Sequence, residues 1–124
     1  MSLTATAPVR SSSRVFEVND HNFAETTLGS PLPVLVDFTA VWCPPCRVIA
    51  PHIEALAAAY EGRVGFGKCD VEENPEVIAR YDVRNMPTLL LFKDGAVIGQ
   101  IVGAVPRARI EALIEKALAP GVQS

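Results

Sequence analysis

The sequence has little of what marks several large classes of protein. Its three cysteines are too few for a disulfide framework, which favours a reducing compartment such as the cytoplasm. No apolar run approaches the roughly 18 residues that span a bilayer, and the N-terminus has no apolar stretch typical of a secretory signal. A formal net charge of -3 leaves no excess of basic side chains for nucleic acid or anionic lipid. We therefore expect a cytoplasmic protein that binds neither nucleic acid nor membranes.

The length and composition predict one folded domain. A chain of 124 residues, of which 49% are hydrophobic and 20% charged, is long enough to bury one sizeable core. Residues 1–14 are rich in Ser, Thr and Ala and contain no acid, so we interpret them as a flexible leader, with a transit peptide as the alternative. We expect the domain to cover residues 15–118 and a C-terminal tail to cover residues 119–124.

The sequence does contain two cysteines with two residues between them, in the segment Trp42-Cys43-Pro44-Pro45-Cys46-Arg47. An apolar run ends just before this segment and a helical pattern follows it. At the start of a helix, unpaired backbone N–H groups and the helix dipole favour a thiolate over a thiol. The segment is therefore predicted to be a redox site. Cys43, at the exposed end of the turn, is expected to attack a disulfide, and Cys46, on the buried face, is expected to resolve the mixed disulfide.

A zinc site with the same cysteine spacing is the alternative. The sequence contains no second C-x-x-C, and only Cys69, His21 and His52 remain as further ligands, so we expect no metal. Cys69 lies in a predicted strand far from the pair and is interpreted as a packed, inert thiol. His52 is off the apolar face of its helix and is interpreted as a surface residue.

The hydrophobic pattern predicts alternating strands and helices followed by a hairpin. Strands are expected at 15–18, 34–38, 64–70, 88–92 and 96–102. A brief helix capped by Asn19 or Asp20 follows the first strand, and a long one follows the cysteines, its apolar stripe formed by Cys46, Ile49, Ile53, Leu56 and Tyr60. A third helix is expected to have Asn74 as its cap, and a last one to begin at Pro106. Asp94-Gly95 is a pair favoured in two-residue hairpin turns, so the last two strands are predicted to be antiparallel.

With this order of elements, the chain resembles the thioredoxin family over roughly residues 15 to 118. The matching positions are Val36-Asp37-Phe38, Trp42-Cys43, Pro45-Cys46, Ile49-Ala50-Pro51, Lys68, Met86-Pro87-Thr88-Leu89-Leu90-Leu91-Phe92 and Val102-Gly103-Ala104. The resemblance implies the thioredoxin fold, a three-layer α/β/α arrangement with a central mixed five-stranded sheet and four helices. It also implies a redox-active disulfide between Cys43 and Cys46 in place of any cofactor.

The resemblance implies roles for residues outside the cysteine pair. Asp37 resembles the buried acid that assists the resolving cysteine, and its apolar neighbours should raise its pKa toward neutrality. Structural pairing of this carboxylate with Lys68 on a neighbouring strand is the alternative. The resemblance also implies that Pro87 is cis and lies beside the cysteines.

A client protein is expected to dock around Cys43. The Met86 backbone can pair with an extended client segment as an added strand. Trp42, Pro87 and the loop at Gly103 would surround Cys43 as a shallow apolar face, with ordinary half-buried packing as the alternative for Trp42. Gly103 is expected to let a partner backbone approach closely.

The sequence departs from the family at the reactive turn itself. The usual dipeptide between the cysteines is Gly-Pro, whereas here it is Pro44-Pro45. Neither proline has an N–H for the Cys43 sulfur, so the Cys46 N–H remains as the donor. Further departures are Thr39 in place of an aromatic residue and Asn85 in place of a glycine. Pro44, Pro45 and Lys68 are therefore expected to tune the redox potential.

We predict a protein-disulfide reductase, a thiol-disulfide oxidoreductase that carries electrons for redox homeostasis. The resemblance implies disulfide-containing client proteins and a flavoprotein thioredoxin reductase as electron donor, and a monomer is expected. Two alternatives stay open: a specialised redox protein with a shifted potential that serves a narrow client or acts as an oxidant, and a non-catalytic binding module with incidental thiols.

Overall fold

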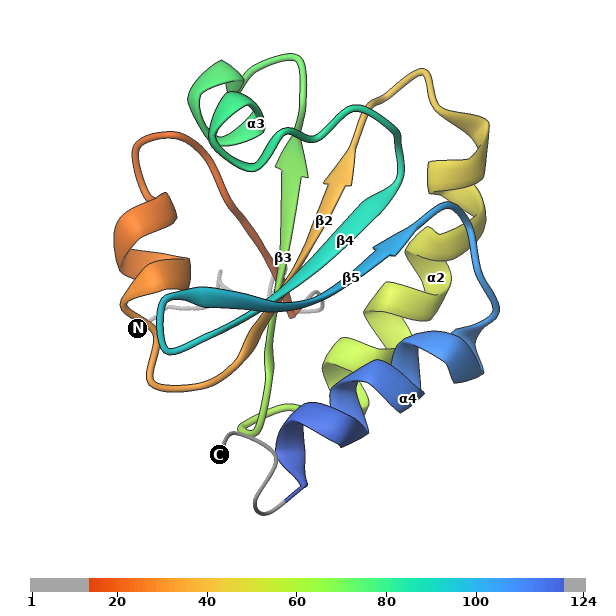
Figure 1. Cartoon of the computed structure of the whole chain (residues 1–124). Helices are drawn as coiled ribbons and strands as arrows, with labels where there is room; N and C mark the ends of the chain where they lie inside the picture. The colour runs from red at the N-terminus through yellow and green to blue at the C-terminus, as the bar shows by residue number, and fades with distance from the viewer. Residues whose placement is uncertain (1–13, 120–124) are drawn as a thin grey trace, which may run out of the picture.

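A computed structural model describes residues 14–119, coloured along the chain in Figure 1. The elements are, in chain order, β1 (Val15–Glu17), η2 (Ala24–Leu28), β2 (Val34–Thr39), α2 (Pro44–Ala59), β3 (Gly65–Asp70), α3 (Pro75–Tyr81), β4 (Thr88–Lys93), β5 (Ala96–Val102) and α4 (Arg107–Leu118). Apart from Arg14 and Ala119, the predicted leader and tail lie outside the described residues. The strands and helices confirm the predicted thioredoxin fold.

The five strands form one mixed sheet in the order β1-β3-β2-β4-β5. β1 and β2 pair with β3 in parallel, whereas β4 is antiparallel to both β2 and β5. At the predicted hairpin turn Asp94 and Gly95 have φ angles of 54° and 81°, as a two-residue turn with positive φ at both positions requires. β2 is central and its faces are both covered, which explains its almost uninterrupted apolar sequence.

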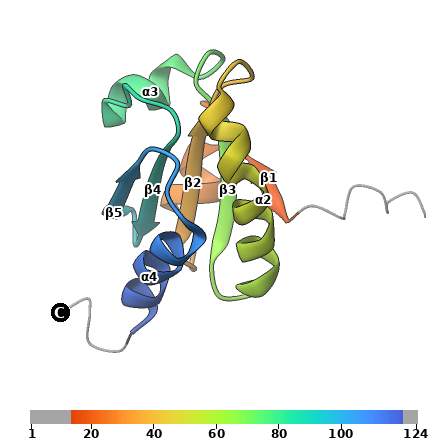
Figure 2. The same cartoon turned by 90° about the vertical axis from the view of Figure 1, so that its right-hand side faces the viewer.

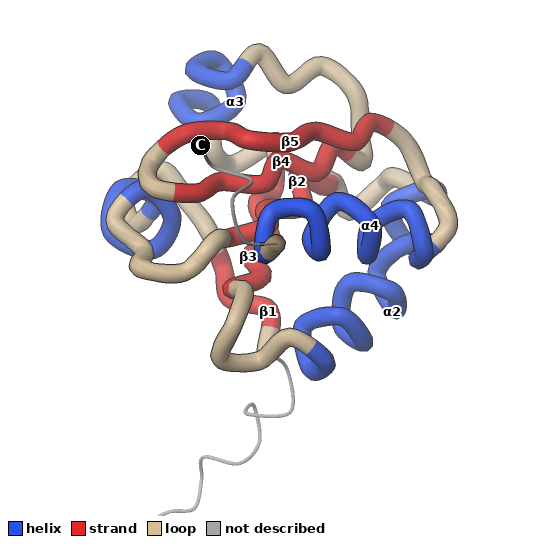
Figure 3. The backbone as a smooth tube through the Cα atoms, turned by 60° about the horizontal axis from the view of Figure 1, so that its bottom comes forward, coloured by secondary structure: helices blue, strands red, loops and turns tan. Residues whose placement is uncertain are grey.

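Helices cover both faces of the sheet and enclose two separate cores (Figures 1 and 3). α2 and α4 lie on one face, and Figure 2 shows both in front of the strands. Their apolar stripes bury Ile49, Ile53 and Leu56 of α2 and Ile110 and Ile114 of α4. η2 and α3 lie on the other face. The stripe predicted for α2 is confirmed, because each of its members is buried.

The prediction that Asn19 or Asp20 caps the first helix is wrong, because the N-cap of η2 is Phe23, which makes no side-chain capping hydrogen bond. The turn before this helix is held by the side chain of Asn19. Its side-chain oxygen Oδ1 accepts hydrogen bonds from the backbone N–H of His21 at 2.9 Å and of Asn22 at 2.8 Å. The helix that follows is a π-helix, η2, and Gly29 ends it.

Asn74 is the N-cap of α3, as predicted, but its side chain makes no capping hydrogen bond. Its Oδ1 accepts from the backbone N–H of Asp20 at 2.9 Å, and its Nδ2 donates to the Asp70 carbonyl at 2.9 Å. The Asp20 carboxylate caps the helix instead, accepting from the N–H of Glu76 at 3.1 Å and of Val77 at 3.0 Å. The reason is tertiary, since β1 lies beside β3 and brings Asp20 to the start of α3.

Candidate active site

The reactive turn begins α2. Cys43 is the N-cap, with extended backbone angles (φ −99°, ψ 105°), and its Sγ accepts a hydrogen bond from the Cys46 N–H at 3.2 Å. Pro44 and Pro45 occupy the first helical positions, where a missing N–H is tolerated because the first turn has no carbonyl partner for it. The predicted donor to the Cys43 sulfur is thus confirmed.

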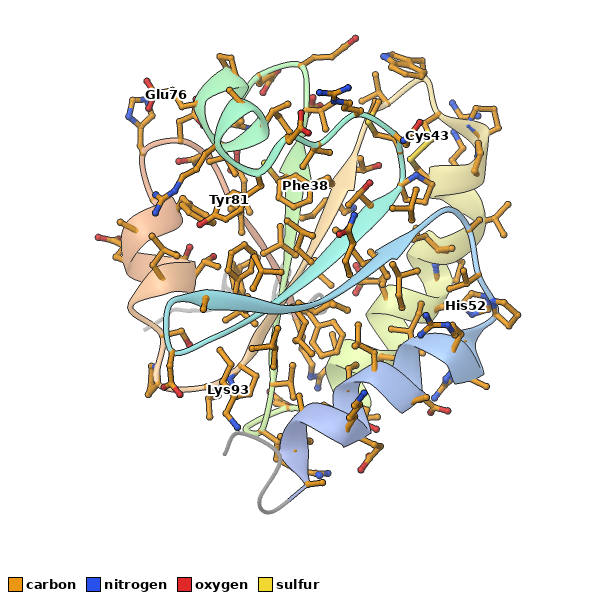
Figure 4. The ribbon with its side chains drawn as sticks, in the orientation of Figure 1. Phe38, Cys43, His52, Glu76, Tyr81 and Lys93 are labelled. Atoms are coloured by element: carbon orange, nitrogen blue, oxygen red, sulfur yellow. A yellow bond between two sulfur atoms is a disulfide. The ribbon has the colours of Figure 1, made fainter. Side chains whose placement is uncertain are left out.

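The two cysteines are joined as a disulfide, with their Cα atoms 5.3 Å apart. Figure 4 shows this disulfide at the N-terminal end of α2, above His52, which is partly exposed further along the same helix. Among residues 14–119 no group of three or more His, Cys, Asp or Glu side chains is placed to hold a metal ion. The arrangement allows thiol-disulfide exchange, because each sulfur is within bonding reach of the other.

The prediction that exposure distinguishes the two cysteines is wrong for the disulfide form. Cys43 is 2% exposed and Cys46 is 4% exposed. Both cysteines lie in a small apolar cluster with Ala40, against which Val71 and Met86 also pack. What distinguishes the cysteines instead is position, since only the Cys43 sulfur accepts the helix N–H that would favour its thiolate.

Asp37 is buried at the middle of β2, on the same face of the sheet as α2. Its side chain is 2% exposed, and its Oδ1 has no hydrogen-bond partner. Burial raises the pKa of Asp37 to about 7, and the Lys68 ammonium opposes that shift. The predicted direction of the pKa shift is confirmed. Near neutral pH this carboxyl group therefore exists in both protonation states.

The predicted pairing of Asp37 with Lys68 is present in the strand register but not as an ion pair. The two residues face each other across β2 and β3. Among the described residues, no ion pair or hydrogen bond joins their side chains.

A cavity of about 310 Å³ connects Asp37 with Cys46, and both residues line it. Lys68 and Arg47 line the same cavity, so its walls are partly polar. The cavity is also large enough to hold water. The Arg47 guanidinium donates from Nη2 to the Val41 carbonyl at 3.0 Å, which fixes the backbone just before Cys43. The cavity supplies a route for a proton between Cys46 and the Asp37 carboxyl.

The loop beside the disulfide has the predicted cis bond between Met86 and Pro87. Two hydrogen bonds hold this loop: Thr88 Oγ1 donates to the Asn85 carbonyl at 2.6 Å, and the Gly103 N–H donates to the Pro87 carbonyl at 2.9 Å. Gly103 has a φ of +99°, and a Cβ there would meet no atom within 4 Å. The position is thus open to an approaching chain, although its backbone conformation favours glycine.

The apolar surface at the disulfide differs in one respect from the prediction. Pro87 is itself buried and offers no surface of its own. Trp42 is 54% exposed, so about half of its surface is buried and the alternative of ordinary half-buried packing stays open. Val41 and Val48, near the cysteines in sequence, are also exposed. We use the name docking face for the exposed apolar side chains of the reactive turn, the start of α2 and the end of β5: Val41, Trp42, Val48 and Val102.

Sequence reasoning missed the residue that orients Trp42. The indole Nε1 donates to the Glu72 carboxylate at 2.6 Å, across 30 positions of sequence. No local pattern could have revealed this pair, because the loop after β3 brings Glu72 to the reactive turn only in the folded protein. Cys69 matches its prediction: it is fully buried, and burial raises the pKa of its thiol to about 12, so it stays protonated.

Comparison with known proteins identifies relatives over nearly the whole domain. The thioredoxin family model matches residues 14–116. The chain is 43% identical over 102 residues to thioredoxin 1 of Nostoc sp., covering 82% of this chain and 95% of that protein. It is 44% identical over 102 residues to thioredoxin of Synechocystis sp., with the same coverage of 82% and 95%, and 44% identical over 105 residues to thioredoxin C-2 of Corynebacterium nephridii, covering 85% and 97%. With a bonded cysteine pair at the start of α2, the chain belongs to the thioredoxin family and is a thiol-disulfide oxidoreductase.

Proposed function

We propose that this protein reduces the disulfides of client proteins, with Cys43 as the attacking thiolate. The observation that carries this assignment is the hydrogen bond from the Cys46 N–H to the Cys43 sulfur at the N-cap of α2. In the first step a bond forms between Cys43 Sγ and one client sulfur. The client disulfide breaks, and its second sulfur leaves as a thiolate that takes a proton from water.

In the second step Cys46 resolves the mixed disulfide. The Asp37 carboxylate accepts the Cys46 proton through water in the shared cavity. The Cys46 sulfur then bonds to Cys43 Sγ and displaces the first client sulfur as a thiolate. The client gains two electrons and the protein is left as the disulfide. A pKa of about 7 suits Asp37 to this role, because the carboxyl can both accept and release a proton near neutrality.

The client is held at the docking face by apolar contact and by backbone pairing. The exposed side chains of Trp42 and Val102 supply apolar area. An extended client segment pairs with the Met86 backbone as an added strand, and the open space at Gly103 accommodates it.

The proposed electron donor follows from membership of the thioredoxin family. A flavoprotein thioredoxin reductase returns two electrons to the Cys43–Cys46 disulfide, and no other cofactor takes part. We place the protein in the cytoplasm as a monomer that carries electrons for redox homeostasis. Within residues 14–119 no helix is long and apolar enough to cross a membrane.

Trapping the mixed disulfide tests the roles of the two cysteines. Cys46→Ser should accumulate a covalent complex with a disulfide-containing protein such as insulin, visible as a shifted band on a non-reducing gel and lost on adding dithiothreitol. The matched variant Cys43→Ser should form none. If Cys43→Ser traps the client and Cys46→Ser does not, the assignment is reversed.

A turnover assay separates the enzyme from a binding module. In the insulin turbidity assay with dithiothreitol, the unaltered protein should accelerate precipitation and Cys43→Ser should match the rate without protein. Equal rates for the two proteins, with client capture surviving replacement of both cysteines, would favour the binding module.

A further inference from the structure

The peptide group between Val41 and Trp42 joins two residues of the docking face. Its oxygen, the Val41 carbonyl, accepts a hydrogen bond from Arg47 Nη2 at 3.0 Å. Among residues 14–119 no backbone N–H donates to this oxygen. Because a peptide group is planar, holding its oxygen also restricts the ψ angle of Val41 and the φ angle of Trp42. The bond from Arg47 therefore constrains the directions in which both exposed side chains leave the backbone.

The first turn of α2 has no backbone donor to spare for this carbonyl. Pro44 and Pro45 have no N–H. The Cys46 N–H donates to the Cys43 sulfur at 3.2 Å, and the Arg47 N–H donates to the Cys43 carbonyl at 3.4 Å. The guanidinium, which carries five N–H donors and a positive charge, supplies the missing bond from the side chain. Arg47 thus spans the two prolines and ties the segment before Cys43 to the helix.

The ring of Trp42 is held separately from its backbone. The indole Nε1 donates to the Glu72 carboxylate at 2.6 Å. The two ends of this residue thus have different anchors, one from α2 and one from the loop after β3. Arg47 and Val41 also line the same cavity of about 310 Å³, and both residues are exposed. Replacing the Arg47 side chain should therefore release the backbone of this segment while leaving the two cores intact.

We propose that Arg47 is a positioning residue that ties the Val41 carbonyl to the first turn of α2 and so holds Val41 and Trp42 in the orientation in which they meet a client. This role rests on the proposed function, in which the docking face binds the client. Side chains that are already ordered lose less conformational entropy on binding, so the bond lowers the free-energy cost of docking. Arg47 takes no part in the exchange of electrons between Cys43 and the client.

NMR relaxation of the Trp42 backbone amide tests the positioning in the protein alone. This N–H lies in the same peptide group as the Val41 carbonyl, and the oxidised protein has no Cys43 thiolate that could respond to the Arg47 charge. The order parameter should be about 0.85 in the unaltered protein and fall below about 0.6 in Arg47→Gln. Arg109→Gln removes the same charge from an exposed position on α4 and should leave the order parameter unchanged. An order parameter that stays high in Arg47→Gln would overturn the proposal.

The kinetics of insulin reduction test what the positioning does for docking. With dithiothreitol in excess and about 0.5 M salt, which screens exposed charges, Arg47→Gln should raise the KM for insulin about fivefold and leave kcat unchanged. Arg109→Gln should change neither constant. A KM that stays the same in Arg47→Gln, with or without a fall in kcat, would overturn the proposal. Failure of the proposed function looks different, because the unaltered protein would then reduce no insulin, while the order parameter would still show whether Arg47 holds the peptide group.

Discussion

At the scale of single residues, Asp37 is the clearest case of function opposing stability. A carboxyl group that is almost fully buried, with one oxygen lacking a hydrogen bond, is costly to ionise. The same burial raises its pKa to about 7 and fits it for proton transfer with Cys46. The site therefore retains a group that an apolar side chain would replace with a gain in stability.

Replacing Asp37 should remove a pH dependence of folding. Burial raises its pKa to about 7 in the folded protein, well above the ordinary value of 3.8, so the folded state binds a proton more tightly than the unfolded state. The contribution of Asp37 to the free energy of unfolding is therefore fully present below about pH 4. It is lost as the pH rises through 7, and the loss is at most on the order of 4 kcal/mol. Asp37→Asn should be more stable than the unaltered protein at about pH 8, with the advantage shrinking toward pH 4.

Denaturant unfolding of the oxidised protein at a series of pH values measures the difference in stability between Asp37→Asn and the unaltered protein. Glu25→Gln, which removes an exposed acid from η2, is the control and should show no comparable trend. A difference between Asp37→Asn and the unaltered protein that is the same at every pH would contradict the expectation. In the turnover assay, the same variant should slow release of the mixed disulfide.

Residues that orient the site come from distant parts of the chain. Cys43, Cys46 and Asp37 could be identified from the sequence because each stands in a local pattern that its chemistry requires. Glu72, which accepts the Trp42 N–H, could not, since 30 residues separate the pair. The burial of both sulfurs also depends on Met86 and Val71, which arrive from other loops.

At the scale of elements, the first turn of α2 determines the chemistry of Cys43. Two consecutive prolines leave the Cys46 N–H as the backbone donor to its sulfur in this turn. The sequence predicted this bond because a cap and the third helical residue are always close in space. The side-chain acceptor at the start of α3 could not be predicted in this way, since the Asp20 carboxylate reaches Glu76 and Val77 across 56 and 57 residues of sequence.

Restoring a second donor should make the protein more oxidising. In Pro45→Ala the new N–H, at the second helical position, can also donate to the Cys43 sulfur and stabilise its thiolate. Stabilising the reduced form raises the reduction potential, by roughly 30 mV for one hydrogen bond to a charged sulfur. Equilibration with glutathione measures the potential, and ultraviolet absorbance of the thiolate should show that it forms at lower pH.

Pro44→Ala is the matched control for this substitution. Its N–H, at the first helical position, does not point toward the cap side chain, so the potential should change much less. Equal changes in the two variants would mean that loss of ring stiffness, and not the new donor, is responsible.

At the scale of the whole molecule, the two cores leave few large apolar side chains exposed. Among residues 14–119 the exposed ones are Leu32, Val97, Ile98 and the four residues of the docking face. The four side chains of the docking face supply less apolar area than a stable dimer needs. One edge strand of the sheet, β1, is short, and the pairing of the other edge strand, β5, with β4 is interrupted by a register shift. Both features disfavour pairing of the sheet with an edge strand of a second copy.

We therefore expect a monomer of 13.3 kDa by light scattering across a wide range of concentrations. Val41→Ser and Trp42→Ala should weaken client reduction several-fold through loss of apolar contact while leaving the mass unchanged. A dimer of the unaltered protein that these substitutions dissociate would show that the docking face binds a second copy instead.

The sequence by itself determined the order of elements, the hairpin turn and the cysteine pair at the start of a helix. Each of these follows from periodicity, turn preference or capping, which act between residues close in the chain. Only the tertiary structure decided that both sulfurs are buried, that the Asp20 carboxylate accepts from the start of α3 and that Glu72 orients Trp42. These contacts join segments far apart in sequence, and strand register and loop packing bring them together only when the whole sheet has formed.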